Sequence, residues 1–175
     1  MSKEDNITIM KKLTLAITLM LGMTSFGQLN YDEWETNFYV DAFGDPTEKS
    51  YSRVFCQGTF SNSATSNSEL TVKVLDDGEY ITISLYEYNR GSEARVGDYD
   101  GSLGNIRYKL SDGTTGTLKC YAPKSGGVYF SKKNYTGFKK LLTDNPNTTI
   151  SFVINEFDCN YGTCSSWIFK MVTPQ

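Results

Sequence analysis

Apolar and polar residues alternate along segment 70–88, which reads LTVKVLDDGEYITISLYEY. Asp77-Gly78 in its middle is a signal for a two-residue type I′ turn, in which both central residues need positive φ. With that dipeptide at the tip, the apolar residues fall on one face of a β-hairpin. The pairs expected in this register are Leu75–Tyr80, Val74–Ile81, Val72–Ile83 and Leu70–Leu85.

Two further hairpins are predicted by the same alternation. Segments 148–157 and 165–173 flank Cys159 and Cys164, and cross-strand neighbours lie close enough for a disulfide. Placing the two cysteines opposite each other pairs Ile154 with Phe169 and Phe152 with Met171. Around the turn sequence SDGTTG, segments 106–110 and 118–121 are expected to pair Leu110 with Leu118 and Tyr108 with Cys120.

Strands are also expected at 34–43, 51–60 and 126–131, and a helix is expected near 134–144. Four apolar or aromatic residues share one face of that helix, and Pro146 ends it. They are Tyr135, Phe138, Leu141 and Leu142. Many short strands separated by turn signals predict an all-β fold, an antiparallel β-sandwich or barrel-like fold with one short helix.

The N-terminal segment predicts export. From Met10 the chain has two lysines, an apolar run at 13–23 and small residues before Gln28, which is typical of a cleaved signal peptide. Residues 1–9 then lie upstream of the true start, and residues 28–175 form a single domain. An uncleaved anchor or a buried helix is the alternative. No later apolar segment is long enough to span a bilayer, so a periplasmic, cell-surface or extracellular location is expected.

The charge of the chain argues against nucleic acid as a partner. Its net charge is −3, and no run of basic residues is present. The basic residues that do cluster in sequence lie around the expected helix, where a solvated face is the simplest interpretation. They are Lys132, Lys133, Lys139 and Lys140.

Four cysteines in an exported chain suggest disulfides. Hairpin geometry favours Cys159–Cys164, which leaves Cys56–Cys120 as the second pair. Free buried thiols fit Cys56 and Cys120 equally well. A zinc site is a weaker alternative, because the spacing lacks a CxxC and the chain has no histidine.

The residue types exclude several chemistries. Without histidine, Ser-His-Asp and Cys-His nucleophiles and His-ligated metals are excluded, and no P-loop or GxGxxG motif occurs. Asp98, Asp100 and Ser102 could form an irregular calcium site, although the EF-hand pattern fails and a polar turn is the simpler interpretation. A carboxylate pair for glycoside hydrolysis, with Glu87 and Glu156 as candidates, is the enzymatic alternative. No cofactor and no metal are expected.

Two features are candidate binding residues. Tyr86 and Tyr88 share the parity opposite the apolar face of their strand, and a ring with a polar tip suits a surface that stacks on sugars or packs on a protein. The alternative is a second face covered by other elements. The loop GTFSNSATSNSEL is expected to be held by its own Asx- and ST-turns. The alternative for this loop is a polar rim that meets a ligand through Ser61, Asn62 and Asn67.

The motifs VDAFGDPT and GTFSNSATSNSEL, with Trp34 before them and YGT and WIFK near the C-terminus, resemble an uncharacterised family of small proteins of bacteria and their phages. The resemblance covers most of the chain after residue 27. That family has no established activity, so the resemblance implies a shared fold and contributes no site residue.

Together these features predict an exported, non-enzymatic binding module for a glycan or small ligand. The first alternative is a protein-interaction or inhibitory module of the cell envelope. The second alternative is a small glycoside hydrolase.

Overall fold

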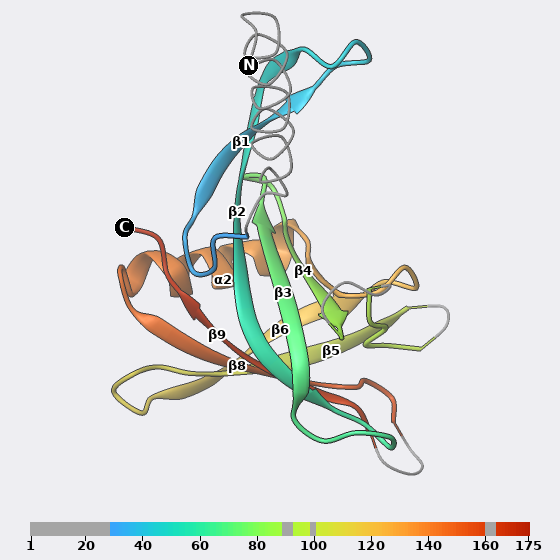
Figure 1. Ribbon diagram of the computed structural model, residues 1–175. Helices are drawn as coiled ribbons and strands as arrows, with labels where there is room; N and C mark the ends of the chain where they lie inside the picture. Colours follow the sequence, from blue (N-terminus) through green and yellow to red (C-terminus); the bar gives the residue numbers. More distant parts are fainter. Residues whose placement is uncertain (1–28, 89–92, 99–100, 160–163) are drawn as a thin grey trace, which may run out of the picture. The chain divides into compact units, whose positions relative to one another are not determined.

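The computed structural model describes residues 29–88, 93–98, 101–159 and 164–175 (Figure 1). The chain divides into two compact units, Met1–Asn30 and Tyr31–Gln175, and the second is described below. The expected signal peptide lies outside the described residues. Within them, no helix combines the length and the apolar character needed to cross a membrane.

The unit Tyr31–Gln175 is an antiparallel β-barrel with one additional strand, which confirms the all-β prediction. The described strands follow the spatial order β1-β2-β3-β4-β7-β6-β5-β8-β9, and β2 also pairs with β9, which closes the barrel. Strand β1 lies outside the closed ring. The strands are β1 (Glu35–Val40), β2 (Pro46–Ser61), β3 (Ser68–Asp76), β4 (Ile81–Glu87), β5 (Ser102–Lys109), β6 (Thr115–Ala122), β7 (Val128–Phe130), β8 (Thr149–Asn155) and β9 (Ser166–Val172).

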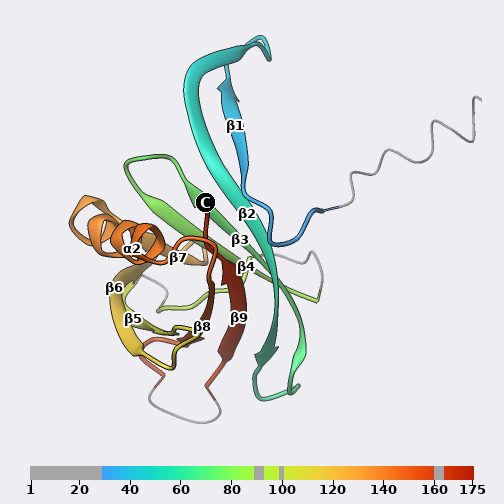
Figure 2. The same cartoon turned by 90° about the vertical axis from the view of Figure 1, so that its left-hand side faces the viewer.

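Helix α2 (Lys132–Asp144) connects β7 to β8 and packs against β6 and β7 (Figure 2). It confirms the expected helix and its apolar face. Phe138, which is fully buried, lies 4.8 Å from the ring centre of Phe130 and 5.8 Å from that of Phe152. The helix is therefore anchored in the barrel core by an aromatic stack.

The β3–β4 hairpin is present, but its register differs by two residues from the expected one. Val74 pairs with Ile83 instead of Ile81, and the ladder ends at the pair Asp76–Ile81. Gly78 has positive φ and Asp77 does not, so the turn is not type I′. The carboxylates of Asp76 and Asp77 accept backbone N–H bonds inside a four-residue connection. A shift of two residues leaves the same apolar side chains facing the core.

The β8–β9 hairpin shows the same two-residue shift. Phe152 pairs with Phe169, not Met171, and Ile154 pairs with Trp167. The chain leaves the ladder at Phe157, whose N–H bonds the carbonyl of Val96 at 2.7 Å. The Cys159–Cys164 disulfide is confirmed, but it staples the connection beyond the ladder and not a cross-strand pair.

In the β5–β6 hairpin the shift is four residues. Tyr108 pairs with Gly116 instead of Cys120, and Ile106 pairs with Leu118. A side chain at position 116 would collide with the Tyr108 ring, since a Cβ there would lie 2.4 Å from its hydroxyl oxygen. Glycine at this position therefore fits the observed register.

The expected second disulfide is not formed. Cys56 and Cys120 are free thiols and both are buried in the hydrophobic core. Burial raises the pKa of the Cys120 thiol to about 12 and also raises that of Cys56. Both residues therefore act as small apolar core side chains.

Strand β1 and the first part of β2 form an arm, defined here as residues 35–51, that projects beyond the barrel (Figures 1 and 2). Strand β1 pairs only with β2 among the described strands, and β3 begins to pair with β2 at Ser52, so β3 gives no strand partner to the arm. At the tip, Asp41 Oδ1 accepts the N–H groups of Phe43 and Asp45 at 2.8 and 3.0 Å. The tip is therefore a structured turn that holds Phe43 in solvent.

Candidate functional site

The outer face of strands β5, β6, β8 and β9, called the basic face below, carries basic side chains and no acidic one. Burial alternates along all four strands, so every second residue points out of the barrel. None of the four strands contains Asp or Glu. The basic residues that point outward are Arg107, Lys109, Lys119 and Lys170.

Strand register brings these cations together. Lys109 pairs with Ser151, and Ser151 pairs with Lys170, so the two lysines lie two strands apart. At a strand spacing of about 4.8 Å, their backbones are ~10 Å from each other. Arg107 lies two residues from Lys109 on the same side of β5, about 7 Å along the strand. A ligand a few sugar or amino-acid units long can therefore contact three of the cations at once.

A shallow groove of about 440 Å³ runs through this face. It combines cationic, hydroxyl and apolar groups, which is the mixture that holds a charged organic ligand. Side chains or backbone of eight residues line it, namely Arg107, Tyr108, Lys109, Thr115, Gly116, Thr117, Ser151 and Val153.

Among the described residues, the four cations form no ion pair; the pairs found there involve Lys49, Arg53, Lys139 and Lys140. The nearest acid in sequence is Asp112, in the β5–β6 turn. Its carboxylate accepts the Thr114 N–H at 2.8 Å, and this bond lowers its pKa. Like charges on one face repel each other, and the barrel fold does not require them. Their accumulation therefore points to an anionic partner.

The two expected tyrosines contact different residues. Tyr86 lies on the outer face of β4, where its ring centre is 5.9 Å from Lys73 Nζ. Tyr88 has φ of 52°, which turns its ring edge-on to the buried Phe60 at 4.9 Å. The two rings therefore face different surroundings, although Tyr88 is 63% exposed.

The loop between β2 and β3 is held by its own hydrogen bonds, as expected. Asn62 Oδ1 accepts the N–H groups of Ala64 and Thr65, and Ser61 Oγ accepts the N–H of Asn67. Asn67 adopts φ of 55°, a conformation that asparagine tolerates well. The side-chain oxygens of Ser61 and Asn62, which were proposed for a ligand-binding rim, thus already accept hydrogen bonds inside the loop.

The carboxylates considered for hydrolysis have structural partners. Glu87 Oε1 accepts the Trp167 indole N–H at 3.0 Å, and Glu156 Oε2 accepts the Ser165 N–H at 2.9 Å. The calcium hypothesis gains nothing either, since Ser102 Oγ accepts the N–H of Asp98 at 2.9 Å and Asp100 lies outside the described residues. No group of three or more potential metal ligands occurs in the part of the chain that the structure describes.

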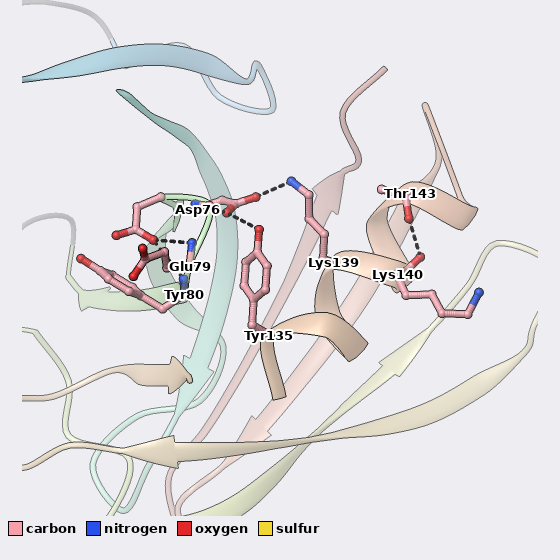
Figure 3. Close-up of polar contacts among 9 residues, drawn as sticks. Asp76, Glu79, Tyr80, Tyr135, Lys139, Lys140 and Thr143 are labelled. Atoms are coloured by element: carbon pink, nitrogen blue, oxygen red, sulfur yellow. Dashed lines mark hydrogen bonds and ion pairs between the residues drawn. The ribbon is translucent and has the colours of Figure 1, made fainter. Parts of the chain in front are cut away.

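The lysines of α2 behave largely as a solvated face with local partners. Lys139 Nζ lies 2.6 Å from Asp76 Oδ2, and Tyr135 donates its hydroxyl to Asp76 Oδ1 at 3.2 Å (Figure 3). Lys140 pairs with Asp144 at 2.7 Å. Burial, followed by the negative charge of Asp76, raises the pKa of Tyr135 to about 12, so its hydroxyl stays protonated and donates. The two contacts with Asp76 fasten α2 to the end of β3, and the Lys140–Asp144 pair lies within the helix.

Asp77, the neighbour of Asp76, predicts a pH dependence of stability. Burial alone would raise its pKa, but N–H bonds from Glu79 and Tyr80 and the charge of Lys49 outweigh burial and lower it. A carboxyl whose folded pKa is depressed adds stability above its unfolded pKa of about 3.9, and this is lost as the pH falls through the folded value. The free energy of unfolding of the wild type should therefore drop relative to Asp77→Asn below about pH 4. Urea titrations of both proteins at several pH values measure this, and a constant difference would contradict the assignment.

Comparisons with known proteins add no functional assignment. No family model matches the chain, and the searches of curated proteins and of solved structures likewise give no match. The resemblance to the bacterial and phage family therefore stays a prediction.

The cations of the basic face were missed in the sequence because they are spread over three strands, β5, β6 and β9. No two of them are adjacent in the chain, so no basic run marks them. The usable signal was the combination of two patterns. Segments 102–109, 115–122, 149–155 and 166–172 all lack acidic residues, and the basic residues of the first, second and fourth of them occupy the solvent parity of their strands.

Proposed function

We propose that this chain is an exported, non-enzymatic binding module whose ligand is acidic and lies on the basic face. The observation that carries the proposal is the set of Arg107, Lys109, Lys119 and Lys170 on one face without an acidic residue in its strands, and the first two of these cations line the groove. Export rests on the N-terminal sequence pattern. If the ligand is a glycan, as the sequence predicted, the basic face requires an acidic polysaccharide, one that carries carboxylate or sulfate groups.

The chemistry of the groove supports such a ligand. Arg107 can hold a carboxylate or sulfate through two parallel N–H bonds, while lysine ammonium groups act as point charges beside it. Thr115, Thr117 and Ser151 offer hydroxyls for the uncharged groups of a sugar. The proposal moves the binding site from Tyr86 on β4 and the Ser61–Asn67 loop to the outer face of β5, β6, β8 and β9.

The test is calorimetric titration with polygalacturonate, with neutral dextran as the uncharged comparison. We expect wild-type protein to bind polygalacturonate and not dextran, with affinity falling between about 50 and 500 mM NaCl because salt screens exposed charges. Arg107→Glu/Lys109→Glu should weaken binding at least about tenfold at low salt, since two attractions become repulsions.

The matched control is Lys124→Glu/Lys132→Glu, which makes the same change in net charge outside the four strands. Both lysines are exposed, so the variant should fold and bind like the wild type. Equal losses in the two double variants would show a nonspecific charge effect and contradict the proposed site. Absence of any binding by the wild type would contradict the proposed ligand class.

A further inference from the structure

The arm carries apolar side chains that the fold leaves in water. Phe38, Val40 and Phe43 are 55%, 63% and 92% exposed. Phe43 stands at the tip, where the Asp41 carboxylate fixes the backbone around it. Exposed large apolar residues gathered at a projecting, structured tip are typical of an interaction surface.

The same arm is acidic. Asp41, Asp45 and Glu48 are exposed and form no ion pair among the described residues. The arm's one lysine, Lys49, lies 3.9 Å from Asp77 of the β3–β4 turn, and Glu35 at the base pairs with Arg53. The partner that fits this tip therefore offers an apolar recess bordered by positive charge.

The basic face has that chemistry. Its groove has an aliphatic wall at Val153, and the register places Ile168, which is 45% exposed, beside Val153 on β9. Arg107 and Lys109 border the same groove. Both surfaces are thus complementary in charge and share an apolar component, which favours a specific contact between them.

The arm lies too far from the groove of its own chain to contact it. In both views of the barrel the arm extends at the top, while β5 and β6 lie in the lower part (Figures 1 and 2). The contact therefore has to join two molecules. Because the two surfaces differ, the resulting interface is heterologous and can repeat from one molecule to the next.

We propose that the arm of one molecule docks in the basic groove of a second copy of this chain, with Phe43 against the groove wall and Asp41, Asp45 and Glu48 facing its cations. This inference rests on the proposed function, because it takes the same groove as the binding site and names a protein ligand for it. Acidic polysaccharide and the arm then compete for Arg107 and Lys109.

Sedimentation velocity of the protein purified from the periplasm of an expression host tests this proposal. One arm tip in one groove is a small interface, so association is expected over a range of about 1–100 µM. We expect the weight-average sedimentation coefficient to rise with concentration at about 50 mM NaCl and to return towards the monomer value at about 500 mM. A monomer throughout that range at low salt would overturn the proposal.

Two variants separate the surfaces. Phe43→Ser removes the aromatic side chain at the arm's tip and leaves the groove unchanged. Arg107→Glu/Lys109→Glu reverses the charge of two groove residues and leaves the arm unchanged. Both replace exposed side chains, so both should fold. Each variant alone should be monomeric. An equimolar mixture should form a heterodimer that cannot extend, because one functional arm and one functional groove remain.

The equimolar mixture distinguishes the arm-in-groove contact from other modes of self-association. A mixture that stays monomeric, or a Phe43→Ser protein that associates like the wild type, would overturn the arm-in-groove contact. A measurement of polygalacturonate binding distinguishes failure of the self-association proposal from failure of the proposed function. Phe43→Ser should bind it like the wild type, so a protein that binds polygalacturonate but never self-associates would leave the proposed function standing and reject this inference alone.

Discussion

Replacing Phe138 by alanine is expected to lower the free energy of unfolding by about 3–5 kcal/mol. Phe138 is fully buried and lies between Phe130 and Phe152, so alanine would leave a cavity where α2 meets the barrel. The loss combines the transfer free energy of the ring with the cost of the cavity. Chemical denaturation of the two proteins measures it directly.

The control for Phe138 is Thr136→Ala on the exposed face of the same helix. It should change the free energy of unfolding by no more than about 0.5 kcal/mol. A loss below about 1 kcal/mol for Phe138→Ala would mean that the barrel core forms without the helix, which contradicts the packing described here.

Alanine at Gly58 should destabilise the barrel by about 2–3 kcal/mol. Gly58 pairs with Leu70 on one side and with Phe169 on the other, at the point where β2 meets β9 and closes the ring. An added Cβ would lie 2.3 Å from the Ile168 carbonyl oxygen and 2.8 Å from the Phe169 Cβ. Strand β9 must therefore move away from β2, and amide exchange along β9 should become faster.

The same substitution at Gly137 should have the opposite sign. Gly137 lies inside α2, is exposed, and its nearest neighbour would be a Leu118 methyl carbon at 3.8 Å. Alanine there should stabilise the protein by about 0.5–1 kcal/mol, because it restricts the unfolded chain and favours helix. Equal effects at Gly58 and Gly137 would contradict the tight approach of β2 and β9.

The sequence predicted which side chains are buried better than it predicted which strands pair where. Alternation assigned the core residues of β3, β4, β8 and β9 correctly, because a register shift of two residues keeps every side chain on its face. It could not locate the turns. Asp76 and Asp77 form the β3–β4 turn with their carboxylates, and Phe157 leaves β8 to bond Val96.

The sequence also did not predict which strands pair to close the barrel. The pairing of β2 with β9 joins segments more than a hundred residues apart, and no local signal encodes it. In the order β7, β6, β5, β8 two strands separate β7 from β8, although α2 alone joins these two along the chain. The sequence predicted a sandwich or a barrel, and long-range pairing decides between them.

The candidate site was predictable only in part. The loop with Ser61, Asn62 and Asn67 was expected to satisfy its own hydrogen bonds, and it does. Tyr86 and Tyr88 share strand parity, but the positive φ of Tyr88 breaks that parity and sends its ring to Phe60. The basic face required the register of four strands, which the sequence did not supply.

The measurement that tests the central claim most directly is an amide chemical-shift map of the protein during titration with polygalacturonate. The account predicts that the shifted amides lie on β5, β6, β8 and β9, around Arg107, Lys109 and Lys170. Shifts concentrated at Tyr86, Tyr88 and the loop from Ser61 to Asn67, with the basic face unchanged, would contradict it.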